Sequence, residues 1–114
     1  MASAPEIREK LLTLGIPVAY LQFKTPQAPP YAVYYESDTD ILGADGYNLY
    51  RDVEITVELY SPKKNPQLER RLENLFREVE IDKAGDTALD GENLIMTVFA
   101  FRTIQSIEEE EENA

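Results

Sequence analysis

The chain has 114 residues, 43% of them hydrophobic, and this length and composition are typical of one globular domain with a single core. It contains no cysteine and no histidine, which excludes disulfides, thiolate metal sites, cysteine nucleophiles and a Ser-His-Asp triad. The formal net charge is −11, and a body of this charge repels nucleic-acid phosphates and anionic membranes.

The first predicted element is a short N-terminal helix. Ser3 can cap its first turn, and Glu6 follows three residues later, as in a capping box. Gly15 offers a left-handed stop, and Pro17 cannot continue a helix. We therefore expect the helix to end shortly before Gly15.

Three strands are predicted between residues 18 and 60. Apolar alternation predicts a short strand over Val18–Phe23, and three prolines within residues 24–30 then require an extended connection. The Tyr- and Val-rich segment Tyr31–Glu36 is typical of a second strand. Acidic residues and glycines in Ser37–Tyr47 indicate either a long hairpin loop or an extended ribbon tip. Strict alternation over Leu49–Tyr60 predicts the returning strand, with one wet face.

After Tyr60 the period of the apolar residues changes from two to that of a helix. Asn65 can cap this second helix, with Pro66 at its first position. A one-faced strand followed directly by a one-faced helix predicts a helix-on-sheet layer. The apolar stripe of the helix, about 100° wide, contains Leu68, Leu72, Leu75, Phe76 and Val79.

Two more strands are predicted in the last third of the chain. A short strand around Thr87–Leu89 leads into Asp90-Gly91, which is a strong hairpin signal. The segment Leu94–Ile104 is apolar on both faces, which is typical of a strand that lies centrally in its sheet, or of one with a helix on one face and a neighbouring subunit on the other. Residues 108–114 form an acidic run without core residues, and we expect a disordered tail there.

These elements predict an α+β fold in one domain over residues 1–107. We expect a mainly antiparallel sheet of about five strands with two helices packed on one face, in the order α-β-β-β-α-β-β. The other face is then partly exposed, and its aromatic side chains can contact a partner. The candidates are Tyr34 or Tyr35, Tyr50 and Tyr60.

No motif in the chain predicts a reaction. Asp38, Asp40 and Gly43 resemble part of a calcium loop, but Leu42 and Leu49 stand at positions that should supply oxygen ligands. Carboxylates are numerous, yet nothing singles out two of them as an acid–base pair. The glycines match no nucleotide-binding spacing. We therefore expect no catalytic residue, no cofactor and no metal.

The chain also lacks the patterns of secretion, membrane insertion and DNA binding. Its N-terminal residues show no basic and apolar leader, and no segment approaches the roughly 20 apolar residues of a membrane span. Glutamates interrupt the lysines and arginines of residues 63–77, so this predicted helix presents a solvated face rather than a DNA footprint.

Several short phrases resemble a known family in their order and spacing. They are Leu11–Tyr20, Pro29–Tyr35, Gly43–Asp45, Val57–Tyr60 and Asn65–Glu69. The chain resembles the tail terminator proteins, also called tail completion or head–tail joining proteins, of long-tailed phages and prophages of Gram-positive bacteria. The resemblance covers about residues 7–104 and leaves the acidic tail outside.

The resemblance implies a non-enzymatic role in virion assembly. Such proteins form a ring, usually a hexamer, on the last ring of the tail tube, where they stop tube growth and create the surface that joins the filled head. The implied partners are further copies of the chain, the tail tube protein and a connector protein of the head neck. DNA would pass through the ring without specific binding. The implied location is the tail–head junction of the virion, and the host cytoplasm during assembly.

Within this hypothesis, the segment 38–47 is the candidate for contacts between subunits or with the tube. Its apolar residues would be exposed on a loop unless a partner covers them. Two alternatives remain open: another connector or stopper protein of the neck, and, less favoured, an acidic DNA mimic that inhibits a host enzyme. The candidate interface residues are Asp38, Asp40, Ile41, Leu42 and Tyr47.

Overall fold

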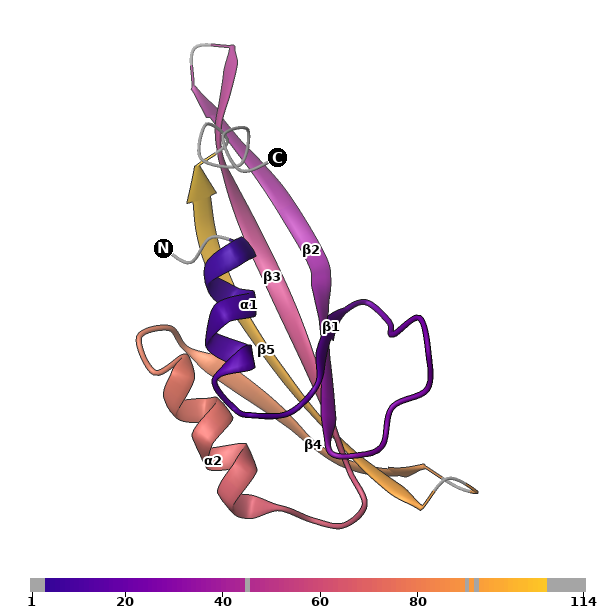
Figure 1. The fold of residues 1–114 in the computed structure, drawn as a ribbon. Coiled ribbons are helices and arrows are strands. Elements are labelled where there is room, and N and C mark those ends of the chain that lie inside the picture. The colour runs from indigo at the N-terminus through magenta and orange to yellow at the C-terminus, as the bar shows by residue number, and fades with distance from the viewer. Residues whose placement is uncertain (1–3, 45, 90, 92, 107–114) are drawn as a thin grey trace.

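A single sheet of five strands, in the order β1-β2-β3-β5-β4, carries both helices on one face (Figure 1). The computed structural model describes residues 4–44, 46–89, 91 and 93–106. The predicted α+β class and the element order α-β-β-β-α-β-β are confirmed. The elements are α1 (Ala4–Leu12), β1 (Val18–Tyr20), β2 (Tyr31–Ala44), β3 (Tyr47–Ser61), α2 (Pro66–Leu75), β4 (Ile81–Leu89) and β5 (Leu94–Ser106).

The sheet is mainly antiparallel, as predicted. Only β1 runs parallel to its neighbour, β2, and every other pair of adjacent strands is antiparallel. β3 pairs with β2 on one side and with β5 on the other over most of its length. β5 lies between β3 and β4, which confirms the internal position that its two apolar faces predicted.

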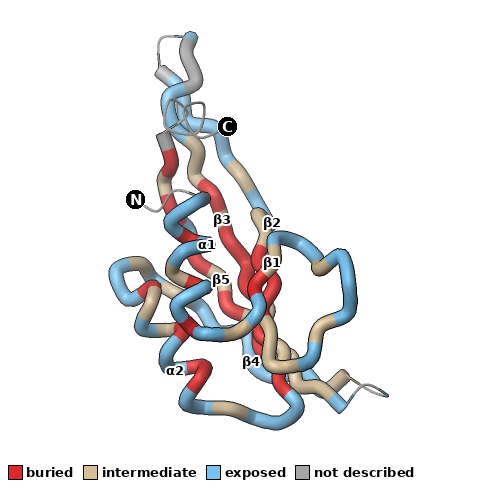
Figure 2. The backbone as a smooth tube through the Cα atoms, viewed as in Figure 1, coloured by how far each residue is buried: buried red, intermediate tan, exposed pale blue. Residues whose placement is uncertain are grey.

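The hydrophobic core lies between the helices and the sheet (Figure 2). Every second residue of β3 from Val53 to Leu59 points into it and is buried. Phe76, just after α2, stacks on Phe101 of β5 with ring centroids 4.5 Å apart. Full burial of one such side chain contributes about 1.5–3 kcal/mol. The helices contribute Ile7, Leu11, Leu68 and Leu72.

The start of α2 is as predicted, but its end is earlier. The Asn65 side chain accepts a hydrogen bond from the backbone N–H of Leu68 at 3.2 Å, and Pro66 opens the helix. The helix stops at Leu75, so the prediction of Val79 as part of its stripe is wrong. Val79 still packs against the core from the turn that follows, which explains why its spacing looked helical.

Several predicted boundaries also move. β1 ends at Tyr20 rather than at Phe23, because Leu21 adopts a positive φ of 69° that breaks the extended backbone. β4 begins at Ile81, well before the predicted Thr87, and a bulge between Lys83 and Gly85 lets the strand continue past the glycine.

Gly15 has the left-handed φ expected at the end of the first helix, 77°. The predicted cap Ser3, the turn residue Asp90 and the predicted tail 108–114 lie outside the described residues.

One buried carboxylate links α2 to the sheet. Glu69 is 2% exposed and accepts ion-pair contacts from Lys64, at 2.7 Å, and from Lys83 of β4. Burial by itself raises the pKa of Glu69, but the hydrogen bonds from the two lysines outweigh it and hold the pKa below its ordinary value. The ionised form therefore stabilises the folded protein.

Glu69→Gln should lower the free energy of unfolding at pH 7 by about 1–3 kcal/mol, because the lysines lose their anionic acceptor. Since the folded-state pKa of Glu69 is lowered, this difference is fully present above the unfolded-state pKa of about 4.3. It should shrink as pH falls through the lower folded-state value. Urea unfolding of both proteins at several pH values measures it.

The matched control is Glu73→Gln. Glu73 is also on α2 and lies 3.6 Å from Lys83, but its side chain is 39% exposed. A pair this exposed contributes about 0–1 kcal/mol, so the control should lose clearly less stability. Equal losses for the two variants would show that burial of Glu69 is not what makes its contacts strong.

Candidate functional site

The face of the sheet that the helices leave uncovered carries the polar side of β3. Its even-numbered residues alternate with the buried ones and face outward. They form the solvent-facing side that the alternation predicted for this strand. Neighbouring strands add residues at matching registers, so that the face holds a tyrosine cluster around Glu58 and an ion cluster around Arg102. The tyrosine cluster lies near the C-terminal end of β3, and the ion cluster lies closer to its N-terminal end.

In the tyrosine cluster, Glu58 accepts hydrogen bonds from two phenol groups. The donor–acceptor distances are 2.8 Å from Tyr35 and 2.7 Å from Tyr60. Tyr31 stacks on Tyr60 with centroids 4.9 Å apart. Burial, followed by the hydrogen bond to Glu58, raises the pKa of Tyr60 well above its ordinary value, so it stays protonated as a donor. Glu58 is thus already satisfied by its own chain.

The structure decides between the two tyrosines that the sequence left open. Tyr34 points into the core and is 6% exposed, whereas Tyr35 is on the uncovered face. Tyr60 is there as predicted, and Tyr50 is 43% exposed near the far end of β3.

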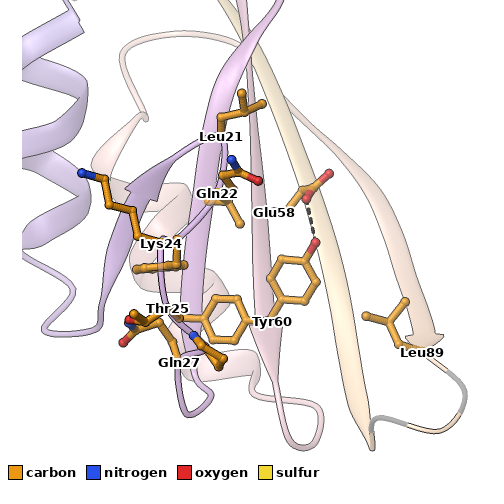
Figure 3. A pocket seen from close by; sticks show the side chains of 12 residues that line it. Leu21, Gln22, Lys24, Thr25, Gln27, Glu58, Tyr60 and Leu89 are labelled. Atoms are coloured by element: carbon orange, nitrogen blue, oxygen red, sulfur yellow. Dashed lines mark hydrogen bonds between the residues drawn. The ribbon is translucent and has the colours of Figure 1, made fainter.

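A hollow of about 510 Å³ opens beside this cluster (Figure 3). The segment from Leu21 to Gln27 forms one wall, and Glu58 and Tyr60 of β3 form the other. Phe23 in the first wall meets Tyr31 edge to face, with centroids 5.5 Å apart. The lining is mixed, with apolar rings beside one lysine and one glutamate.

In the ion cluster, Arg102 of β5 lies among four carboxylates of β2 and β3. Its side-chain nitrogens are 3.0 Å from an oxygen of Asp52, 3.2 Å from Asp38, 3.5 Å from Asp40 and 3.8 Å from Glu54. One cation thus holds two acidic strands together where like charges would otherwise repel across the ladder. Asp38 and Asp40, which resemble part of a calcium loop in sequence, bind an arginine instead.

A bulge in β2 makes this cluster possible. The register shifts between Glu36 and Asp38, which places Asp38 opposite Glu54 on the uncovered face. Ser37, the extra residue, donates a hydrogen bond to the Glu54 carboxylate at 2.8 Å. Sequence reasoning missed Arg102, whose only signal was that it is the one charged residue of its strand.

The turn end of β2 and β3, residues 38–54, forms a hairpin that projects beyond the helices and that we call the ribbon (Figure 1). β5 still pairs with β3 as far as Tyr50, so the ribbon is two-stranded only beyond Leu42 and Tyr50. Pairing persists to Gly43 with Asn48 and Ala44 with Tyr47, so the alternative of a long loop is wrong. The predicted interface residues Asp38, Asp40, Ile41 and Leu42 all lie on this ribbon and are exposed. Tyr47 lies at its end by backbone position.

The ribbon exposes apolar side chains from both of its strands. Ile41 is 51% exposed and Leu42 is 42% exposed. Leu42 is the direct partner of Tyr50, and Leu49 occupies a second bulge between Leu42 and Gly43 on the ladder. Leu49 is 45% exposed and was not predicted, although its place at the start of an alternating strand was visible in the sequence.

A second hollow, of about 600 Å³, lies at the opposite end of β3, where the chain passes into α2. Three prolines, Pro30, Pro62 and Pro66, contribute apolar walls. Three cations, Lys63, Lys64 and Arg70, give it a positive character. We call this feature the proline hollow.

Within the described residues, no group of three or more acidic side chains is arranged to hold a metal ion, and no helix is long and apolar enough to cross a membrane. No protein-family model matches the chain, and no curated protein matches its sequence.

Arg102→Gln should lower Tm in low-salt buffer, because the four carboxylates lose their shared cation. The loss should shrink at about 1 M salt, where the Debye length falls to about 3 Å and the carboxylates no longer repel one another. Thermal unfolding at both salt concentrations measures it. Arg8→Gln, on the exposed side of α1, is the control and should leave Tm nearly unchanged. A salt-independent loss at Arg102 would instead indicate packing of its aliphatic stem.

Proposed function

We propose that this chain is a tail terminator, a non-enzymatic virion protein that caps the phage tail tube as a ring and joins tail to head. The observation that carries the proposal, beside the sequence resemblance, is the ribbon. It projects beyond the helices and exposes Ile41, Leu42 and Leu49, with Ile41 and Leu42 on opposite faces of β2. Exposed apolar residues grouped on a projecting element mark a protein–protein contact. A ring closed by contacts between copies, and seated on a tube, uses such an element.

The charge of the chain supports the same role. A terminator ring surrounds the path that DNA takes from head to tail. With a net charge of −11, the chain repels phosphates rather than binding them. In the proposed assembly, DNA passes the ring without adhering to it.

The Arg102 cluster weighs against the DNA-mimic alternative. A mimic presents free carboxylates at the spacing of phosphates, whereas Asp38, Asp40 and Asp52 share one arginine. The rival role as another connector of the neck uses the same kind of surface, and it is distinguished by the partner. A terminator binds the tail tube protein, whereas a stopper binds proteins of the head neck.

Electron microscopy of particles made without this chain tests the proposal. Heads and tails should form separately, with tails that are overlong or unattached, and supplying the chain in trans should restore normal virions. Purified chain should also bind tail tube protein in a pull-down. Normal virions in the absence of the chain would refute the role, and capture of a host nuclease or polymerase instead of tube protein would favour mimicry.

Replacing Ile41 and Leu42 together by aspartate should leave the monomer folded but weaken ring formation. Both side chains are about half exposed in the monomer, so their loss costs little stability, while two charges in an apolar contact are costly. Light scattering at matched concentration compares ring formation, and circular dichroism checks the fold. The control is Leu12→Asp on α1, a leucine that is 45% exposed. Unchanged ring formation by the double variant would remove the ribbon from the interface.

A further inference from the structure

The two ends of the molecule are complementary in both charge and polarity. At one end, the ribbon segment 38–54 contains five acidic residues and one arginine, and its tip exposes apolar side chains. At the other end, the proline hollow combines apolar walls with three cations. β3 joins them, and its 15 residues span roughly 50 Å at about 3.3 Å per residue. One copy therefore cannot fill its own hollow with its own ribbon.

We infer that the ribbon tip of one copy docks into the proline hollow of the next copy. The inference rests on the proposed ring and specifies its subunit contact. Leu42 and Asp40 share one face of the ribbon, so Leu42 would pack against the prolines while Asp40 would face the cations at the rim. A contact between two different patches is heterologous, and repeated copies of it close into a ring or extend into a filament.

Two of the three cations in the proline hollow are available for this contact. Lys64 is engaged within its own chain, at 2.7 Å from Glu69 and 2.8 Å from Asp86. Lys63 and Arg70 are exposed and form no ion pair with any residue in the described part of the chain. On the ribbon, Asp40 is the most exposed member of the Arg102 cluster, at 68% of its side chain. Free cations and an exposed carboxylate favour association.

The size of the hollow also suits the tip. Its volume of about 600 Å³ falls in the range of clefts that bury a small ligand, about 300–1,000 Å³. Proline side chains offer rigid apolar walls that lose no rotamer entropy on binding. The hollow can therefore receive the Leu42 side chain without reordering its own proline walls.

Other receptors for the ribbon fit less well. The hollow beside the tyrosines contains Lys24 and Glu58, so its charges nearly cancel, and Glu58 is already paired with two phenols. The outer edge of β4 is interrupted by the bulge at Lys83 and carries alternating charges, both of which oppose pairing with a foreign strand.

Variants that each disable one end provide the decisive test. The ribbon variant carries Ile41→Asp with Leu42→Asp, and the hollow variant carries Lys63→Glu with Arg70→Glu. Each alone should stay monomeric, with the self-association constant weakened by about 100-fold or more relative to wild type. An equimolar mixture should give a 1:1 heterodimer that grows no further, because one working ribbon meets one working hollow. Light scattering coupled to size exclusion reports the masses.

The charge-matched control is Arg8→Glu with Lys24→Glu, which should associate like wild type. The inference is overturned if the hollow variant associates normally, if the mixture gives no heterodimer, or if the control is weakened equally. It is also overturned if the wild-type chain stays monomeric at its highest soluble concentration. Circular dichroism and Tm establish that each variant is folded.

Because the chain has no cysteine, a disulfide can report the contact directly. Leu42→Cys in one copy and Gln67→Cys in another should cross-link on mixing under oxidising conditions, whereas Leu12→Cys and Gln67→Cys should not. Equal cross-linking of both pairs would overturn the contact. These variants keep every charge, so the result does not depend on the reversals above.

The outcomes separate this contact from the proposed function. Normal rings from the hollow variant, together with overlong tails in particles that lack the chain, would refute the contact and leave the terminator role standing. Head-to-tail association in solution, together with normal virions that lack the chain, would support the contact and refute the terminator role.

Discussion

The fold depends on the register of β3, because this strand serves both faces of the sheet. Its odd-numbered residues from Val53 to Leu59 complete the core beneath the helices, and its even-numbered residues build the outer face. A slip of one residue would exchange the two sets and bury Glu54 and Glu58. The burial of the apolar set therefore fixes where the tyrosine and ion clusters form, and the function of the outer face depends on the stability of the inner one.

Two ion clusters link elements on opposite faces of the sheet. Glu69 ties α2 to β4 through Lys83, on the helical side of the sheet. Arg102 ties β5 to the base of the ribbon, where β2 and β3 run beyond the cover of the helices. The first carboxylate is almost fully buried, so its pairs are poorly screened by solvent. The second cluster is exposed, so we expect added salt to weaken the ion pairs of Arg102 more than those of Glu69.

Local patterns predicted the elements but not the tertiary contacts. Alternation in β3, the Asn65 cap and the Gly15 stop were legible because each depends on neighbours in sequence. Three boundaries were missed. A positive φ at Leu21 ends β1, a tight last turn ends α2, and β4 starts earlier than predicted because a bulge lets it run past Gly85. Arg102 was missed for a different reason: its partners come from other strands, and only the register brings them together. Of the predicted interface residues, Asp38, Asp40, Ile41 and Leu42 are exposed on the ribbon, and Tyr47 pairs with Ala44 at its end. The sequence left this segment undecided between loop and strand.

The exposed apolar residues of the ribbon support the proposed contact between copies. Ile41, Leu42 and Leu49 each keep about half of their surface in water, so folding of the monomer buries only part of their apolar area. Solubility alone would favour polar residues at these positions. In the proposed assembly, contact with a second copy covers this apolar surface. The net charge of −11 opposes association of identical copies, so such a contact needs cations placed opposite the ribbon. Lys63 and Arg70 at the far end of β3 are the cations that the proposed contact places opposite the ribbon, so the proposed assembly has a direction along β3.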